Sequence, residues 1–438
     1  MTRTAGLSVK AKSVLLVLAC SALTMIGFIG RPAQAQNRAG DVPEVVLEAY
    51  STGFYRPALI VRNKGIFELP QERRPIARRF SARLYYALKW SGYVEIVEDL
   101  PEDSTTLRGT PPMELVTSFG NTQPRMTAMV WLGEPGETEA FYEGDIGIEE
   151  GNADDAAEAA AEELLYRLTG MLPPFRSRIV CSQALENDVK ELVLLSFDGA
   201  KRWPLTKDGS INLSPGWSPD GRKIVFCSFR GGRDADLYIA DLDARRIRPL
   251  LQRQGTDAAP AWSPDGKQIL FAGSSGAGTD LYLVNPDGAN LRNLTRSPSI
   301  DTSPSWAPTS RDIVFMSDRS GNPQIYRIDV DGANLLRLTY DGTYNAEPAW
   351  SPAGDRIVYV RREANGFQLR MMTPAGDADI PLTNEPGDHL APAWTPDGMK
   401  ISYTYNGTLW VMNADGTDPR ELAARGNLAD WSPISNPD

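Results

Sequence analysis

The chain has 438 residues, of which 42% are apolar and 23% charged, with a formal net charge of −11. This length accommodates two domains and a large core, and the composition is ordinary for a soluble globular protein. The acidic balance argues against a general nucleic-acid-binding protein, which would present a basic face. A single histidine, His389, and three cysteines are too few for the usual zinc sites, so metal-dependent hydrolysis is not expected.

Residues 1–35 have the pattern of a secretory signal peptide. Basic residues precede an apolar run at 14–30, and the small-residue sequence AQA follows at 33–35. The run is short for a membrane span, which disfavours a retained anchor. A leucine stands two positions before Cys20, where a lipidation signal has a small residue, and this disfavours a lipoprotein. We therefore expect an exported chain without another span.

Residues 36–48 form a segment of a different kind. They begin polar, as QNRAGD, and then become strand-like, as VPEVVLE. A free terminus of this type is usually disordered, but it also has the character of an edge strand that adds to a partner. The residues leave both possibilities open.

Residues 49–175 lack repeats and predict a small α/β domain with a mixed sheet. An apolar stripe with a period of four predicts a helix over 72–92, formed by Ile76, Phe80, Leu84 and Leu88. A second helix is expected over 152–170, with Asn152 as its cap and Gly170 at its end. Strands are expected at 42–50, 93–98, 112–119, 124–133 and 137–148.

One sequence line, W-[SAT]-P, recurs six times in the rest of the chain. Its spacings are 45, 44, 44, 44 and 37 residues. After five of the lines come a tight turn, two β-rich runs, a second turn and a short strand ending in Leu-Thr or a similar pair. Four short strands in about 44 residues are typical of a β-propeller blade. We expect each tryptophan to pack between neighbouring blades; they are Trp217, Trp262, Trp306, Trp350, Trp394 and Trp431.

The two ends of the repeat region predict how the ring closes. The first unit starts at 177–182 without a preceding tryptophan line, and the last line, at 429–433, has no strand after it. The C-terminus should therefore supply the inner strand that the first blade lacks. Residues 176–438 are expected to form a six-bladed β-propeller closed by this C-terminal inner strand. Cys181 and Cys227 lie in apolar strand patterns, which favours buried free thiols over a disulfide.

The loops divide between the two faces of the predicted ring. The glycine turns share one face, because successive strands alternate in direction. The opposite face carries longer, varied and polar loops, and binding residues concentrate on loops held by a rigid frame. This loop face is the candidate binding face; the alternative is a set of solvated loops without a partner.

The chain resembles the TolB family, the periplasmic propeller proteins of the Tol-Pal system. The resemblance rests on LTGMLPPFRSRI, PGWSPDGRKIVF, SDRSGNPQIYRIDVDGANLLRLT and the terminal DWSP, and it covers nearly all of the chain after the signal. It implies a periplasmic adaptor without cofactor or catalysis. Such proteins bind the lipoprotein Pal through the loop face and TolA through the N-terminal segment, and they support outer-membrane integrity and constriction during division.

Carried onto this chain, the resemblance implies two sets of site residues. The Pal-facing positions lie in the loops before the tryptophans, at Thr256, Asp257, Asp301, Thr302, Asn345, Glu347, Asp388 and His389. The TolA-facing positions lie in the segment 36–48, at Gln36, Asp41, Val42, Glu44, Val45, Val46, Leu47 and Glu48.

Two other classes of function compete with the adaptor. Similar propellers gate serine peptidases, but the sequence contains no G-x-S-x-G elbow, and the only histidine for a triad lies inside a repeat. A propeller that binds a small ligand or calcium is permitted by the acidic loops, although no twelve-residue calcium-loop pattern occurs. Catalysis is therefore not expected, and ligand binding is the runner-up.

Overall fold

The computed structural model describes residues 58–64, 66–97, 113–120, 126–133, 142–232, 234–274, 278–423 and 426–434. These residues form two compact units that meet in the sequence at Phe175 and Arg176, and each unit is described by itself. The predicted signal peptide (1–35), the predicted partner-binding segment (36–48) and the strand expected at 42–50 lie outside the described residues. No helix within the described ranges is long and apolar enough to cross a bilayer.

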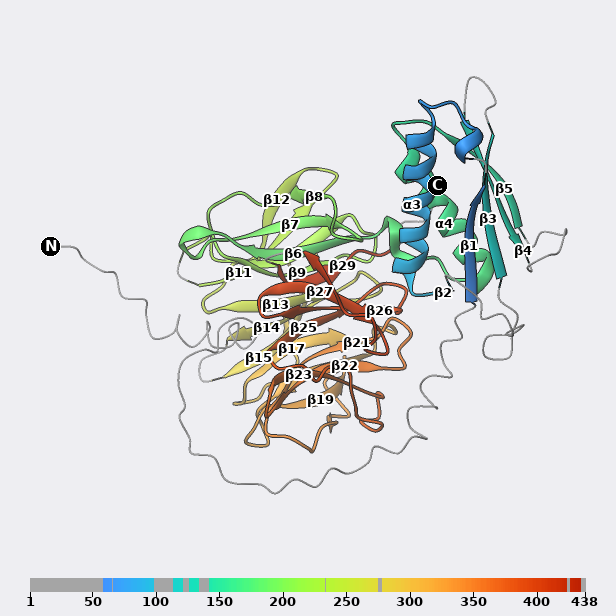
Figure 1. The fold of residues 1–438 in the computed structure, drawn as a ribbon. Coiled ribbons are helices and arrows are strands. Elements are labelled where there is room, and N and C mark those ends of the chain that lie inside the picture. The colour runs from blue at the N-terminus through green and yellow to red at the C-terminus, as the bar shows by residue number, and fades with distance from the viewer. Residues whose placement is uncertain are drawn as a thin grey trace. The chain divides into compact units, whose positions relative to one another are not determined.

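The N-terminal unit is a five-stranded mixed sheet with two helices. The strand order is β2-β1-β3-β4-β5, with β1 parallel to both β2 and β3 and the remaining pairs antiparallel. Both helices lie against the same side of the sheet (Figure 1). The strands are β1 (Ala58–Lys64), β2 (Glu95–Ile96), β3 (Met113–Gly120), β4 (Met126–Gly133) and β5 (Tyr142–Ile148); the helices are α3 (Arg74–Ser91), α4 (Ala153–Thr169) and the short 3-10 turn η1 (Ile66–Glu68).

The predicted apolar stripe explains how α3 packs. Phe80, Leu84 and Leu88 are buried, whereas Ile76 at the first turn is only partly covered. On the solvent side of the same helix, Arg79 and Arg83 form ion pairs with α4, to Asp154 and Glu158 respectively. Both pairs join residues 75 positions apart, so the two helices run parallel to each other.

The ends of α4 confirm one prediction and correct another. Gly170 ends the helix in a left-handed conformation (φ 72°), and its N–H donates to the carbonyl of Tyr166 (2.7 Å). Asn152 precedes the helix, but its side chain does not cap it. Instead, its Oδ1 accepts a hydrogen bond from the backbone N–H of Glu149 (2.6 Å). The Asn152 side chain thus bonds to the backbone three residues before it and stabilises the turn that follows β5.

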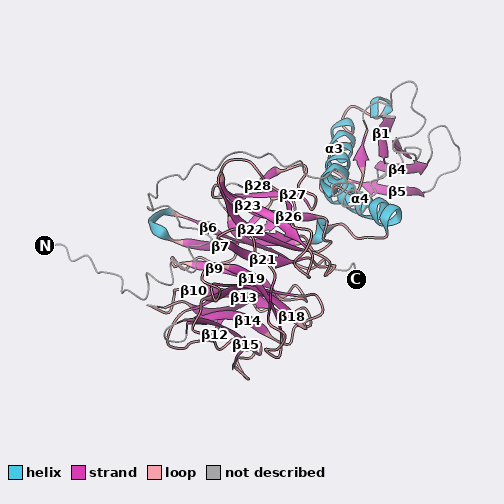
Figure 2. Ribbon diagram, turned by 90° about the horizontal axis from the view of Figure 1, so that it is seen from below, coloured by secondary structure: helices cyan, strands magenta, loops and turns pink. Residues whose placement is uncertain are grey.

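The second unit is the predicted six-bladed propeller, built almost entirely of strands (Figure 2). Each blade is a four-stranded antiparallel sheet. Five blades follow in chain order: β9 to β12 (Asn212–Trp217, Lys223–Ser228, Asp236–Asp241, Arg246–Leu251), β13 to β16 (Asp257–Trp262, Ile269–Ser274, Thr279–Val284, Arg292–Asn293), β17 to β20 (Asp301–Trp306, Asp312–Ser317, Gln324–Asp329, Leu336–Arg337), β21 to β24 (Asn345–Trp350, Ile357–Glu363, Gly366–Met372, Ile380–Pro381) and β25 to β28 (His389–Trp394, Lys400–Tyr405, Thr408–Asn413, Arg420–Ala423).

The sixth blade, which we call the closing blade, combines the two ends of the repeat region. Its strands are β6 (Arg178–Ala184), β7 (Lys190–Ser196) and β8 (Arg202–Pro204), and its inner strand is β29 (Asn427–Trp431) from the end of the chain. β29 pairs antiparallel with β6. The backbone N–H of Arg178 also donates to Ser432 Oγ (2.8 Å), 254 positions later in the sequence. The predicted closure by a C-terminal inner strand is confirmed.

The recurrent tryptophans pack between blades, as their spacing predicts. Trp306 donates from its indole N–H to the backbone carbonyl of Ala261 in the preceding blade (3.2 Å), and Trp394 does the same to Ala349 (3.0 Å). Trp217 lies in an apolar cluster with strands of the closing blade, including Val180. The scaffold role expected for these residues is therefore the one that the structure shows. The two cysteines in this unit are buried free thiols, as expected.

Candidate binding face of the propeller

The six inner strands surround a central channel, and each carries the same irregularity. The residue three positions before each tryptophan has a left-handed backbone conformation, with φ between 47° and 51°, and the pairing register shifts there. Non-glycine residues rarely adopt this conformation, and bulges of this type re-aim a strand near functional sites. The six residues are Ser214, Ala259, Ser303, Glu347, Ala391 and Leu428.

These bulges line a cavity of about 160 Å³ in the channel. All six inner strands contribute to its wall, which consists mainly of serine, alanine and proline. Among the described residues that line the wall, only Glu347 is charged; it is 8% exposed, and its Oε2 accepts a hydrogen bond from the backbone N–H of Ala391 (2.6 Å). The channel therefore offers small side chains and one fixed carboxylate.

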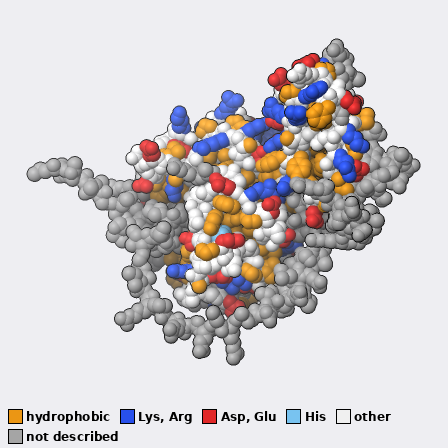
Figure 3. Space-filling view, viewed as in Figure 1, with side chains coloured by type: hydrophobic (Ala, Val, Ile, Leu, Met, Phe, Trp, Pro, Cys, Tyr) orange, Lys and Arg blue, Asp and Glu red, His pale blue; other side chains and the backbone are white. Residues whose placement is uncertain are grey.

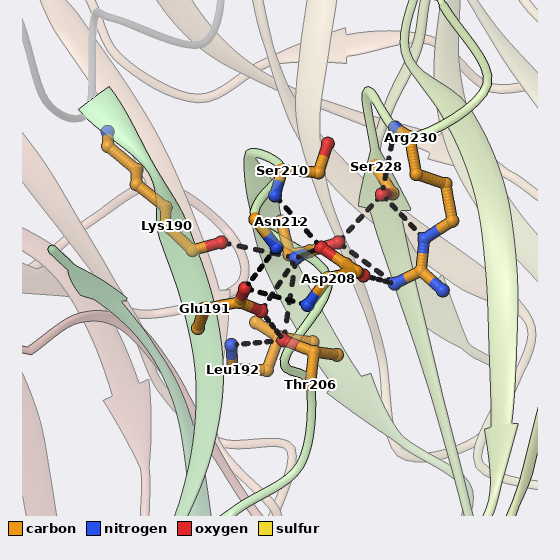
Figure 4. Close-up of polar contacts among 10 residues, drawn as sticks. Lys190, Glu191, Leu192, Thr206, Asp208, Ser210, Asn212, Ser228 and Arg230 are labelled. Atoms are coloured by element: carbon orange, nitrogen blue, oxygen red, sulfur yellow. Dashed lines mark hydrogen bonds and ion pairs between the residues drawn. The ribbon is translucent and has the colours of Figure 1, made fainter. Parts of the chain in front are cut away.

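At the loop face, a polar cluster fixes four of the connections between blades. In Figure 4, Glu191 of β7 accepts the Thr206 hydroxyl and the backbone N–H groups of Asp208 (2.9 Å) and Gly209 (2.7 Å). Asn212, the first residue of the next inner strand, donates to Glu191 (3.3 Å). Equivalent threonine contacts recur in three other blades, from Thr295, Thr339 and Thr383 to Asp280, Gln324 and Gln368.

Four arginines lie at the same face, each stacked on an aromatic ring of its own blade. Their guanidinium carbons lie 4.4–5.6 Å from the ring centroids, a distance typical of cation–π contacts. Each is also held by the first residue of an inner strand: Arg230 by Asn212, Arg253 by Asp257, Arg319 by Asp301 and Arg361 by Asn345. We call these four units the arginine stacks.

The structure places the predicted Pal-facing residues in two groups. Thr302 and Glu347 line the channel cavity together. Asp257, Asp301 and Asn345 take equivalent positions at the start of three inner strands, and each is 0% exposed inside an arginine stack. Of the remaining three, His389 takes the equivalent position at the start of β25, and Thr256 and Asp388 each precede the first residue of an inner strand.

The buried members of this set differ in charge behaviour. Both carboxylate oxygens of Asp301 accept hydrogen bonds from the Arg319 guanidinium (3.0 and 2.9 Å). Desolvation raises the pKa of Asp257 to about 6, although Arg253 opposes the shift. Burial lowers the pKa of His389, whose ring stacks on Tyr405 with 4.5 Å between the centroids. His389 therefore acts as a neutral aromatic ring at the position where the other blades use an acid or an amide.

The arginines of the stacks were missed by the sequence reasoning. A local signal exists in two blades, where Ser-x-Arg ends the second strand at Ser228–Arg230 and Ser317–Arg319. In each case the serine hydroxyl accepts the arginine Nε–H, which turns the side chain back over the rings. Arg253 comes from a different loop. It fills the space above Gly273, where a Cβ would lie 1.8 Å from the guanidinium.

Other features of the surface do not point to a charged ligand. On the face shown in Figure 3, acidic, basic and apolar side chains of the described residues are interspersed. Among the described residues, no group of three or more His, Cys, Asp or Glu side chains is arranged to hold a metal ion. The predicted TolA-facing residues, Gln36 to Glu48, lie outside the described part of the chain.

Comparisons with known proteins agree on one family and one fold. A family model described as the TolB beta propeller domain matches residues 165–435. A protein named Tol-Pal system protein TolB, from Desulfosudis oleivorans, is 39% identical over 84 residues, which are 19% of this chain and 19% of that protein. A protein of the same name from Sodalis glossinidius is 36% identical over 94 residues, which are 21% of this chain and 22% of that protein. The chain thus matches about a fifth of the length of these relatives.

A solved structure shares the whole architecture. The crystal structure of TolB from Acinetobacter baumannii superposes with a TM-score of 0.70 at 21% identity, covering 86% of this chain and 97% of that one. At this level of identity the likeness shows the fold, a small α/β unit followed by a six-bladed propeller.

Proposed function

This chain belongs to the TolB β-propeller family, and on that premise we propose that it is a periplasmic adaptor of the Tol-Pal envelope system. It binds the lipoprotein Pal through the loop face of the propeller and TolA through residues 36–48. Its role is to help to maintain the outer membrane and to constrict it during division. The proposal draws on the family match across the propeller and on relatives named as Tol-Pal system proteins.

The single observation that supports the Pal site is the cavity in the channel, in a ring whose inner strands begin in the arginine stacks. Loops that are already fixed by hydrogen bonds and stacked cations lose little conformational freedom on binding, so contacts made there contribute fully to affinity. Thr302 and Glu347 face the cavity, where a projecting segment of a partner would meet small side chains and one carboxylate. The buried acids of the stacks then act by holding the loops in position rather than by touching Pal.

The TolA site is proposed from the sequence of the N-terminal segment. Val42 to Glu48 reads VPEVVLE, a strand-like run of valine and leucine between two glutamates, which suits strand addition to the sheet edge of a partner. Removal of residues 36–48 should abolish TolA binding and leave Pal binding intact. Loss of both interactions on removal of the segment would contradict two separate sites.

The direct test is a calorimetric titration of the purified protein with the soluble domain of Pal from the same organism. We expect a one-to-one complex. Glu347→Gln keeps an oxygen that can accept the Ala391 N–H but removes the charge from the channel. If that carboxylate faces the partner, the affinity for Pal should fall about tenfold. Asp331→Asn removes an exposed charge from a turn on the opposite face and is the matched control.

The outcomes separate the adaptor from the runner-up. If Glu347→Gln leaves the affinity for Pal unchanged, or if Asp331→Asn weakens it, then Pal does not bind in the channel. Absence of any complex at high micromolar concentration would reject the adaptor. Melting curves with calcium and with small ligands would then test the propeller as a ligand-binding protein.

A further inference from the structure

One cross-strand pair occupies the same position in all six blades, and its composition sets the closing blade apart. The pair joins the second and third strands, counted from the channel. In five blades the second-strand member is aromatic; the pairs are Phe226–Tyr238, Phe271–Tyr282, Phe315–Tyr326, Tyr359–Arg370 and Tyr403–Trp410. In the closing blade the pair is Cys181–Val193. Both large side chains are replaced by small ones.

The aromatic members of these pairs fill the seams between blades. Phe315 lies in a buried cluster with Leu294, which follows the outermost strand of the preceding blade. Tyr359 packs with Leu338 in the same way at the next seam. A ring thus packs near an outer-strand leucine of the blade before it. At the closing seam, the equivalent leucine is Leu422, and the residue that should meet it is Cys181.

The missing rings leave a cavity at the closing seam. It measures about 400 Å³, compared with about 160 Å³ in the channel. Its apolar wall includes Cys181, Val193, Leu195 and Leu422, from the second and third strands of the closing blade and from β28. Replacing a ring by a smaller side chain leaves such a space when the backbone does not collapse into it. Here the backbone is held apart by the ring of blades.

We propose that this seam cavity binds a small molecule that carries a single aromatic ring. The other seams of the same propeller show that a ring fits against an outer-strand leucine at this position, and apolar cavities in protein interiors bind ring-shaped molecules such as benzene. Cys181 is 1% exposed, and burial raises the pKa of its thiol to about 12, so it presents a neutral surface to the ring.

The polar groups at the cavity indicate which substituent the bound ring should carry. Gln183 is 7% exposed and brings an amide to the wall, while the exposed Arg202 and Glu421 stand at its solvent side. An amide that both donates and accepts suits a neutral hydroxyl or amide group on the ring, and the two opposite charges at the rim favour no net charge. Phenol is therefore the simplest probe.

The first experiment follows the melting temperature of the purified protein with increasing phenol and, separately, with cyclohexanol. A ligand that binds the folded seam raises the melting temperature in a saturable way. We expect phenol to bind at least fivefold more tightly than cyclohexanol, which has the same size but is not flat. Equal affinities, or no shift with either compound, would overturn an aromatic-ring site.

Variants place the binding at the seam. Cys181→Phe restores the ring of the other blades and should abolish the phenol shift, whereas Cys227→Ala, at an equally buried thiol that does not line the cavity, should retain it. A phenol shift that survives in Cys181→Phe would refute the location.

A measurement on the unaltered chain keeps the test independent of how the variants fold. Methyl NMR spectra of the protein are compared with and without phenol. Saturating phenol should shift the methyl signals of Val193 and Leu422, which line the cavity, and leave that of Val225, buried at another seam, unchanged. Equal shifts at all three residues, or none at Val193 and Leu422, would contradict occupancy of the cavity.

Discussion

Asp430, in the last strand of the chain, accepts a hydrogen bond from the backbone N–H of Trp217, 213 positions earlier (2.7 Å). Trp217 belongs to the blade that follows the closing blade. The last strand is thus joined to β6 on one side through its ladder and to β9 on the other through this carboxylate. Desolvation raises the pKa of Asp430 to about 6, since only two backbone N–H bonds oppose it.

The raised pKa of Asp430 predicts a dependence of stability on pH. A carboxyl whose folded pKa lies above its unfolded value of 3.8 contributes stability that is complete below pH 4 and is lost as the pH rises through 6. Asp430→Asn keeps the acceptor for Trp217 and removes the charge. We expect the variant to gain on the order of 2 kcal/mol relative to the unaltered protein between pH 4 and pH 7.

Urea denaturation of both proteins at pH 4, 5, 6 and 7 measures this gain. Asp257 shifts in the same direction and His389 in the opposite one, but both are present in the two proteins and cancel in the difference. A difference in unfolding free energy that stays constant with pH would show that Asp430 does not titrate in this range.

Removal of residues 429–438 should destabilise the whole propeller. The deletion takes away most of β29 and exposes the edge of β6, so the ring loses its closure and two seams lose their inner contacts. Calorimetry should show a lower and broader propeller transition. Deletion of 435–438 alone is the control and should leave the curve unchanged. A normal melting curve for the longer deletion would mean that the five remaining blades hold the ring without their closure.

Gly199 makes the closest glycine contact at the closing seam. It has a φ of 73°, and a Cβ would lie 2.0 Å from the carbonyl oxygen of Leu422. Gly209 has a φ of 68° with no atom within 4 Å of its Cβ position. Substitution by alanine there therefore measures the cost of the left-handed backbone alone. We expect Gly209→Ala to cost about 1 kcal/mol and Gly199→Ala about 3 kcal/mol or more, because the second change also separates the two blades. Equal losses in chemical denaturation would argue against close packing at this seam.

The arginine stack at Asp301 predicts a non-additive pair of substitutions. Arg319→Met leaves a fully buried carboxylate without its cation, which typically costs about 3–5 kcal/mol. Asp301→Asn combined with Arg319→Met removes both charges and should cost less than Arg319→Met alone. Unfolding free energies of the single and double variants test this order. If the double variant is the less stable one, the Asp301 carboxylate is not an uncompensated charge in the absence of Arg319, and loss of the ion pair does not explain the cost of Arg319→Met.

The fold could be predicted from the sequence because it is repetitive. The spacing of the tryptophans fixed the number of blades, and the unmatched ends at 177–182 and 429–433 fixed the closure. The helix over 72–92 followed from one apolar stripe, and its buried residues Phe80, Leu84 and Leu88 match it. A local rule failed at Asn152, because its side chain has a closer donor in Glu149 than in the helix.

The candidate site was harder to predict, because it depends on contacts between loops. Polar residues before the tryptophans looked solvent-facing in the sequence, yet Asp257, Asp301 and Asn345 are buried. Their partners, Arg253, Arg319 and Arg361, lie 4, 18 and 16 positions away, with no shared spacing. The left-handed bulges also follow from ring geometry rather than from residue type, since serine, alanine, glutamate and leucine all adopt them.

The closure described above also determines when the propeller folds. The closing blade cannot be completed until residues 427–431 have been synthesised, because they form the strand that pairs with β6. Contacts such as that between Arg178 and Ser432 span 254 positions, and such long-range pairing slows folding. Until then the edge of β6 stays open to pairing with strands of other chains, which exposes the unfinished propeller to aggregation.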